Sequence, residues 1–153
     1  MQKIRLGDQL IRYDPERTRT AYARVTTGSA ESCGCPYCRN FLAQRNRVYP
    51  EQFCQVLDQL GIAPEKEGHL FEVGPEGSLV LYNGWFYLAG ELIEAGERMT
   101  DVGPGLQYFF RASHRPKAFA DLGDDVLALE FSAKLRWVLS DPPEWSGRQA
   151  RGQ

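Results

Sequence analysis

The first half of the chain carries the hydrophobic spacing of two helices. In one stretch the apolar residues fall at i, i+3, i+4 and i+7, on one helix face, and they are Phe53, Val56, Leu57 and Leu60. Pro50 suits the first position of this helix, and Gly61 suits a left-handed cap at its end. A second, shorter helix is predicted from Tyr37 to Arg47.

Alternating residues with a preference for β-structure predict strands elsewhere. The stretch TRTAYARVTT at 18–27 is rich in Thr, Tyr and Val, with a period near two. Further strands are predicted at 70–73, 78–82, 85–93, 106–112 and 126–132, with turns at 74–77 and at Asn83-Gly84. A strand, two helices and then a run of antiparallel strands predict an α+β fold. We expect an antiparallel β-meander sheet with two short helices packed on one face.

The strand predicted at 85–93 is apolar on both of its faces. Trp85 and Tyr87 point to one side, and Phe86 and Leu88 point to the other. We therefore expect a central strand that is covered by helices on one side and by a loop or a dimer partner on the other. The alternative interpretation is that these aromatic side chains form a surface for an aromatic ligand or a peptide.

Length and composition indicate one globular domain. The chain has 153 residues, of which 42% are hydrophobic and 25% are charged, and no apolar run approaches the roughly 18 residues of a membrane-spanning helix. Asp141-Pro142-Pro143-Glu144 ends the last periodic segment, so we expect a single domain over residues 1–141 and a flexible tail over 142–153. The first residues lack the pattern of a secretory signal, which favours the cytoplasm.

Charge is spread unevenly although the net charge is only −2. Residues 1–50 carry +5, residues 51–101 carry −8 and residues 102–153 carry +1. The simplest interpretation is that the basic first third faces the acidic middle third of the same chain. A chain that is slightly acidic overall lacks the basic footprint of a nucleic-acid-binding domain, so we expect no nucleic acid and no membrane among its partners.

Three of the four cysteines crowd into Cys33-Gly34-Cys35-Pro36-Tyr37-Cys38. Disulfides stabilise most when they close long loops, so this spacing favours reduced thiols that bind a metal or perform redox chemistry. The pair Cys35 and Cys38 has the spacing that lets two thiolates face one ion, and Gly34 can supply the positive φ that turns Cys33 inward. We therefore predict a structural zinc site at these three cysteines.

A structural zinc site requires a fourth protein ligand. Cys54 is the first candidate, because it lies one position off the apolar stripe of its helix and could face the cysteine loop. His69, just before the first meander strand, is the alternative ligand. Two other interpretations stay open: the thiols bind nothing, with Cys54 a small core residue, or they form a redox pair.

The redox interpretation rests on a local resemblance. The tetrapeptide Cys35-Pro36-Tyr37-Cys38 resembles the active site of glutaredoxins, in which the first cysteine opens a helix whose N-terminus depresses its pKa. That family places an apolar strand just before the motif, in a βαβ unit, whereas residues 28–34 of this chain are small and polar. We therefore discount the family, and keep Cys35 as nucleophile and Cys38 as resolving thiol as an alternative hypothesis.

Several short segments carry a wider resemblance, and they are Cys33-x-Cys35-x-x-Cys38-Arg39-Asn40-Phe41, Leu60-Gly61-Ile62 and Leu81-Tyr82-x-Gly84-Trp85-Phe86. They are similar to an uncharacterised family of small bacterial proteins. The resemblance implies a bacterial, single-domain protein in which the three-cysteine block is a family feature. It implies no activity.

Motifs for nucleotide chemistry are absent, since the chain has neither GxxxxGK[ST] nor GxGxxG. The leading hypothesis is a cytoplasmic, non-enzymatic binding or interaction module, with a protein partner or a second copy of itself, in which a cysteine cluster holds structural zinc. The competing hypothesis is a thiol–disulfide oxidoreductase. The two differ in their demands, because a metal needs three or more thiolates around one point, whereas redox chemistry needs one exposed thiol of low pKa beside a second.

Overall fold

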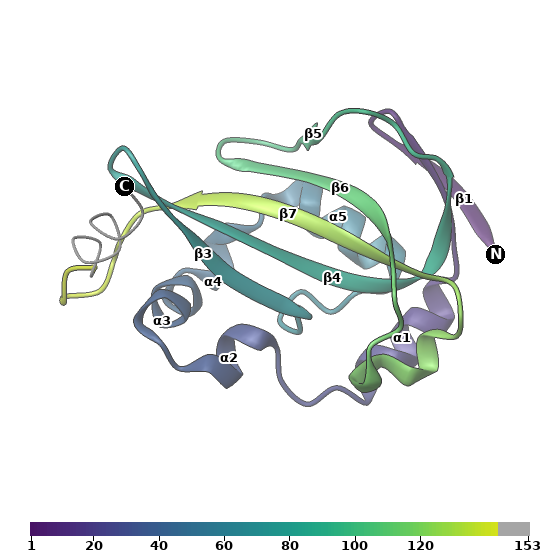
Figure 1. Cartoon of the computed structure of the whole chain (residues 1–153), viewed down its shortest axis with the longest axis horizontal. Coiled ribbons are helices and arrows are strands. Elements are labelled where there is room, and N and C mark those ends of the chain that lie inside the picture. Colours follow the sequence, from purple (N-terminus) through teal and green to yellow (C-terminus); the bar gives the residue numbers. More distant parts are fainter. Residues whose placement is uncertain (144–153) are drawn as a thin grey trace.

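The structure, a computed structural model, describes residues 1–143 and contains one antiparallel sheet of seven strands. The strands are β1 (Gln2–Leu6), β2 (Gln9–Tyr13), β3 (His69–Glu76), β4 (Leu79–Glu94), β5 (Thr100–Asp101), β6 (Leu106–Ser113) and β7 (Val126–Leu135). Their order is β1-β2-β4-β7-β6-β5, and the long β4 also pairs with β3 (Figure 1). One edge of β4 pairs with β7, and the other pairs first with β3 and then with β2.

Short helices complete the α+β fold that the sequence predicts. They are α1 (Pro15–Ala23), α2 (Ser29–Cys33), α3 (Pro36–Ala43), α4 (Arg45–Val48) and α5 (Glu51–Leu60), with a 3-10 helix, η1 (Lys117–Leu122). The predicted helix after Pro50 is confirmed as α5, and Gly61 ends it in the left-handed region at φ 83°. The segment predicted as one helix from Tyr37 to Arg47 is divided into α3 and α4 at Gln44.

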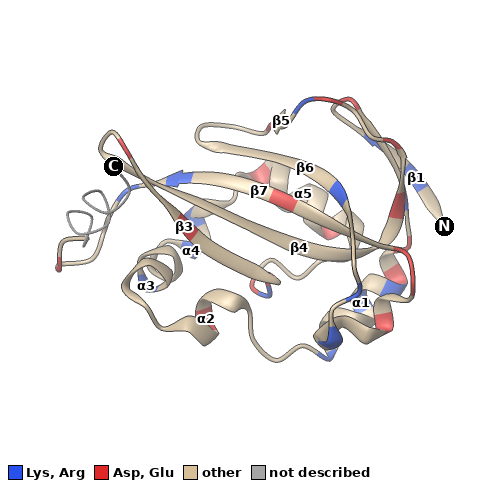
Figure 2. Ribbon diagram, in the orientation of Figure 1, with Lys and Arg blue, Asp and Glu red and all other residues tan. Residues whose placement is uncertain are grey.

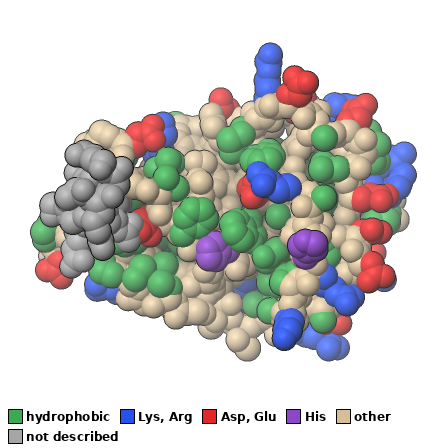
Figure 3. All heavy atoms as spheres, in the orientation of Figure 1, with side chains coloured by type: hydrophobic (Ala, Val, Ile, Leu, Met, Phe, Trp, Pro, Cys, Tyr) green, Lys and Arg blue, Asp and Glu red, His purple; other side chains and the backbone are tan. Residues whose placement is uncertain are grey.

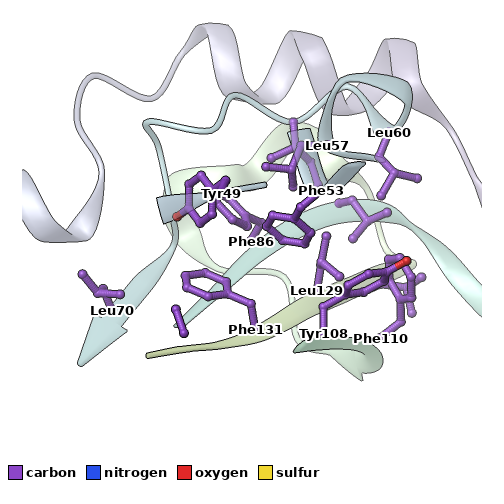
Figure 4. Close-up of a cluster of buried hydrophobic side chains, with 14 of the residues drawn as sticks. Tyr49, Phe53, Leu57, Leu60, Leu70, Phe86, Tyr108, Phe110, Leu129 and Phe131 are labelled. Atoms are coloured by element: carbon purple, nitrogen blue, oxygen red, sulfur yellow. The ribbon is translucent and has the colours of Figure 1, made fainter. Parts of the chain in front are cut away.

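The core lies between the sheet and α5, and it is rich in aromatic side chains (Figure 4). Phe53 and Leu57 of α5 are fully buried, as their spacing predicts. The ring of Tyr49 lies 5.5 Å from that of Phe131 on β7, and the ring of Phe53 lies 5.4 Å from that of Tyr108 on β6. This packing holds α5 against the inner face of the sheet (Figure 1). On the other face, Phe119 of η1 packs against Tyr87 of β4, with 5.2 Å between ring centroids.

The strand predicted at 18–27 is wrong, because α1 occupies most of this segment. Asp14 caps the helix by accepting a hydrogen bond from the backbone N–H of Arg17, and Pro15 stands at the first helical position. The hydroxyls of Thr18 and Thr20 donate to the backbone carbonyls four residues earlier. These threonines therefore fit a helix, because their hydroxyls bond to its backbone carbonyls. Alternation of residue types with a period near two is not evidence for a strand here.

The hairpin turn predicted at Asn83-Gly84 is also wrong, because both residues lie inside the continuous strand β4. A Cβ atom at Gly84 would lie only 2.7 Å from the carbonyl oxygen of His69 and from the ring of Phe131. Glycine is needed there for close approach of the neighbours, not for a turn. The turn predicted at 74–77 falls slightly later, at Gly77-Ser78 between β3 and β4, where Gly77 has φ 62°.

Ion pairs join the basic first third of the chain to the acidic middle third, as the charge pattern predicts. Arg5 on β1 and Arg12 on β2 pair with Glu94 and Glu91 on β4. Figure 2 shows basic and acidic positions on the ribbon at the end of the sheet that contains β1. Part of the charge imbalance is therefore neutralised within the fold. In residues 1–143 no helix combines the length and the apolar character needed to cross a membrane. Most of the tail predicted at 142–153 lies outside the described residues.

Candidate metal centre

The link between α2 and α3 brings the three clustered cysteines together. Helix α2 ends at Cys33, and Gly34 follows in the left-handed region at φ 72°. Cys35 is then the N-cap of α3, and Cys38 lies in the first turn of that helix. The prediction that Gly34 supplies a positive φ is confirmed. A β-carbon at Gly34 would meet nothing within 4 Å, so its conformation rather than crowding calls for glycine.

The three sulfur atoms are close enough to surround one ion. All three Sγ atoms lie within 4.8 Å of one another. Ligands of a tetrahedral zinc ion at 2.3 Å are about 3.8 Å apart, so only small movements are needed to bring the sulfurs to bonding positions. The backbone N–H of Cys38 donates to Cys35 Sγ over 3.4 Å, which orients that sulfur. Cys33 is exposed and Cys38 is buried, so one side of the cluster faces solvent.

The thiols differ in how readily they ionise. Hydrogen bonds lower the pKa of Cys33, first from the backbone of Cys35 and then from the thiols of Cys35 and Cys38. Burial raises the pKa of Cys38, and its thiol neighbours raise it further. Without a cation nearby, Cys38 therefore keeps its proton at neutral pH. A bound metal ion replaces that proton, so metal binding at this cluster is expected to release protons.

A buried carboxylate fixes the start of α2 and hence the position of Cys33. The side chain of Glu67, in the loop before β3, is fully buried and accepts a hydrogen bond of 2.8 Å from the backbone N–H of Ala30. The guanidinium of Arg45 lies 2.9 Å from the same carboxylate. Burial raises the pKa of Glu67, while the hydrogen bond from Ala30 and the charge of Arg45 oppose that shift. This ion pair links α2, α4 and the loop before β3.

A buried amide fixes α3 on the other side of the cluster. Asn40, fully buried on α3, donates to the backbone carbonyl of Arg136 over 3.1 Å and accepts from the backbone N–H of Val138 over 2.8 Å. Its amide also donates to the hydroxyl of Tyr82 on β4, which in turn donates to the carbonyl of Tyr37 over 2.7 Å. Burial raises the pKa of Tyr82 to about 12, so this hydroxyl stays protonated and remains a donor at neutral pH.

Sequence reasoning did not assign either supporting residue a role. The sequence marks Asn40 only as part of the cysteine motif, and no pattern marks Glu67. Their partners are distant in sequence: Ala30 and Glu67 are 37 positions apart, and Asn40 and Val138 are 98 apart. Local spacing therefore gave no signal for them.

The two candidate fourth ligands, Cys54 and His69, do not belong to the group of three cysteines. Among residues 1–143, the only group of three or more potential ligand atoms gathered within 4.8 Å of one another is that of Cys33, Cys35 and Cys38. The thiol of Cys54, on α5, donates to the carbonyl of Tyr49 over 3.6 Å, and burial raises its pKa. The ring of His69 stacks on that of Trp85 with 4.6 Å between centroids. A role of either residue as fourth ligand stays a prediction.

The surroundings of the cluster differ from those of the glutaredoxin motif. The segment before Cys35 forms the helix α2 rather than an apolar strand, and every strand pair in residues 1–143 is antiparallel. This arrangement differs from that family, whose motif belongs to a βαβ unit. The wider bacterial resemblance stays a prediction. None of the family models, curated proteins and solved structures with which the chain was compared matches it.

Proposed function

We propose that this protein is a non-enzymatic binding module in which Cys33, Cys35 and Cys38 hold a zinc ion. The observation that carries the proposal is the approach of all three Sγ atoms to within 4.8 Å of one another. Zinc accepts thiolate sulfur readily, and three sulfur atoms this close together can occupy three corners of its tetrahedron. The fourth ligand of the proposed site is Cys54 or His69.

The proposed ion would have a structural role. Cys33 ends the five-residue helix α2, and Cys35 and Cys38 begin α3, so one ion would tie two short helices across the Gly34 link. Helices this short are marginal without tertiary support. The Glu67 and Asn40 contacts hold the two helices from outside, and the metal would lock the link between them.

The test is the metal content of the purified, unchelated protein, measured by inductively coupled plasma mass spectrometry together with a count of reactive thiols. We expect about one zinc per chain, with the cluster thiols reactive only after chelation. Cys35→Ser should weaken zinc binding by more than about 100-fold, beyond the loss typical of a supporting residue. Cys54→Ser removes the thiol outside the group and tests whether Cys54 is the fourth ligand.

The outcomes separate the ligand sets. Loss of zinc in Cys54→Ser or His69→Gln would identify that side chain as the fourth ligand, and retention in both would contradict a closed structural site that includes either residue. A wild-type protein that neither contains nor takes up zinc would overturn the metal proposal.

Thiol–disulfide exchange is the second candidate, and one observation favours it. Cys33 is exposed, its pKa is lowered, and two further thiols lie within 4.8 Å of its sulfur. These properties suit an attacking thiolate with a resolving partner. In this candidate the nucleophile is Cys33, whereas the sequence favoured Cys35. In the thiol count, this candidate requires a metal-free protein in which Cys33 reacts fastest at neutral pH.

A further inference from the structure

Hydrophobic side chains gather on the sheet face turned away from α5 (Figure 3). Phe71, Trp85 and Phe109 line a groove of about 350 Å³ on this face. The aromatic surface expected as an alternative from the sequence is therefore present, but none of the described residues in the groove identifies what it binds. The cysteine cluster is different, because its donor atoms select the chemistry of a ligand.

The donor set of the cluster consists of sulfur alone. Cys33, Cys35 and Cys38 place three Sγ atoms within 4.8 Å of one another, and no His, Asp or Glu of residues 1–143 belongs to the group. Thiolate ligands favour soft ions, whereas Mg²⁺ and Ca²⁺ require oxygen ligands. The cluster is therefore suited to thiophilic ions.

The number of gathered ligands is three rather than four. Zinc needs a further ligand to complete its tetrahedron. Trivalent arsenic instead forms three bonds to sulfur, and its lone pair occupies the remaining position. Three sulfur atoms around one point are therefore a complete ligand set for arsenic(III), and neither Cys54 nor His69 is required.

The surroundings of the three sulfurs also fit this ion. Cys38 is only 4% exposed and packs against the core, whereas Cys33 is exposed, so a small solute reaches the cluster from solvent and is anchored to the core. Three bonds from thiolates to arsenic(III) leave a complex without net charge. The buried side of the cluster therefore needs no counter-ion to offset a desolvated charge.

We propose that Cys33, Cys35 and Cys38 also bind arsenic(III), supplied as arsenous acid, As(OH)₃. Three S–As bonds form and three As–O bonds break, and each thiol proton leaves with a displaced hydroxyl group as water. No atom changes its oxidation state, so the exchange requires no oxidant or reductant. The product ties the end of α2 to the start of α3. The site rests on the three thiols and not on the proposed zinc.

The test adds arsenous acid to the purified, reduced full chain in excess glutathione and removes free arsenic by gel filtration. Inductively coupled plasma mass spectrometry then measures arsenic and zinc in the same sample. We expect about one arsenic per chain, with bound zinc released, because three linked thiols act together and outcompete separate ones. The zinc content before the addition tests the zinc proposal, and the arsenic content after it tests this one.

Variants identify the ligands. Cys35→Ser should weaken arsenic(III) binding by about 100-fold or more, because one of three linked ligands is lost. Cys54→Ser and His69→Gln should retain arsenic(III), which distinguishes this site from a zinc site with four ligands. Phenylarsine oxide, an arsenic(III) reagent that bonds to two thiols, is the matched probe. Cys35→Ser should still bind it through Cys33 and Cys38.

A second variant covers the case in which Cys35→Ser fails to fold, as measured by circular dichroism. Cys33→Ser changes an exposed position and also leaves two thiols, so it should show the same loss of arsenic(III) and the same retention of phenylarsine oxide. A wild-type protein that retains no arsenic against glutathione would overturn the proposal. So would full retention in a folded Cys33→Ser or Cys35→Ser variant, or loss of arsenic in Cys54→Ser.

Discussion

At the scale of single residues, the ion pair of Arg45 and Glu67 is the most consequential contact near the cluster. Arg45→Met would leave the fully buried Glu67 carboxylate without its cation, at an expected cost of about 3 kcal/mol in the free energy of unfolding at pH 7. Urea denaturation measures this change. Arg47→Met is the matched control, because this exposed arginine on the same helix should change stability by less than about 0.5 kcal/mol.

The same variant has a predictable pH dependence. Burial raises the pKa of Glu67 in the folded protein above that in the unfolded chain, and loss of Arg45 raises it further. In the window between the two pKa values the folded state binds more protons than the unfolded state, so stability rises as pH falls. The deficit of Arg45→Met should therefore shrink as pH is lowered from 7 towards the ordinary carboxyl pKa. A deficit that stays constant or grows over this range would contradict the assignment.

How far the site residues were predictable depended on sequence distance. Cys33, Cys35, Cys38 and the positive φ of Gly34 follow from six adjacent positions, where chain geometry alone limits the arrangement. The hydrogen bond from the backbone of Ala30 to Glu67 is a tertiary contact that no local sequence pattern encodes.

At the scale of elements, a buried threonine helps to hold α1 to the sheet. The hydroxyl of the fully buried Thr18 donates to the carbonyl of Asp14 and accepts from the backbone N–H of Ala89 on β4 over 3.0 Å. Thr18→Val keeps the shape but leaves the Ala89 N–H unsatisfied, with an expected loss of about 1–3 kcal/mol. Thr20→Val, whose hydroxyl bonds only within the exposed face of the helix, should cost less than about 0.5 kcal/mol in the same urea titration. Equal losses would show that helix preference, not the contact with β4, sets the cost.

The elements missing from the sequence prediction carried local start and turn signals that hydrophobic periodicity alone does not include. The alternation at 18–27 matched a strand, but Asp14-Pro15 is a helix start signal that the prediction did not weigh. The predicted α5 was correct because its apolar stripe coincides with the face that the core covers. The N-terminal hairpin of β1 and β2 was not predicted, although Gly7-Asp8 between alternating residues is a recognised hairpin signal.

At the scale of the whole molecule, the sequence predicted the α+β class but not the strand order. A pattern of alternation identifies strands without specifying neighbours, and β7 inserts between β4 and β6. In a flat sheet β2 and β6 would then lie about 14 Å apart, since they are separated by β4 and β7. Yet the side chain of Gln9 on β2 donates to the carbonyl of Phe110 on β6 and accepts from its N–H, over 2.8 and 2.7 Å. The sheet must therefore curl strongly to bring the two strands together.

Gln9 is consequently the contact that closes the curled sheet. Gln9→Leu would leave the backbone N–H and carbonyl of Phe110 without these partners. It would also remove the third hydrogen bond of the Gln9 side chain, which is to the carbonyl of Ala95. We expect a loss of at least about 2 kcal/mol in the free energy of unfolding. Hydrogen exchange should accelerate at the Phe110 amide before it does so at the amides that join β4 to β7, because closure would fail while the central pairing remains. Gln107→Leu, at an exposed position on β6, is the control. Uniform acceleration across all strands would show that Gln9 stabilises the core as a whole and not the closure of the sheet.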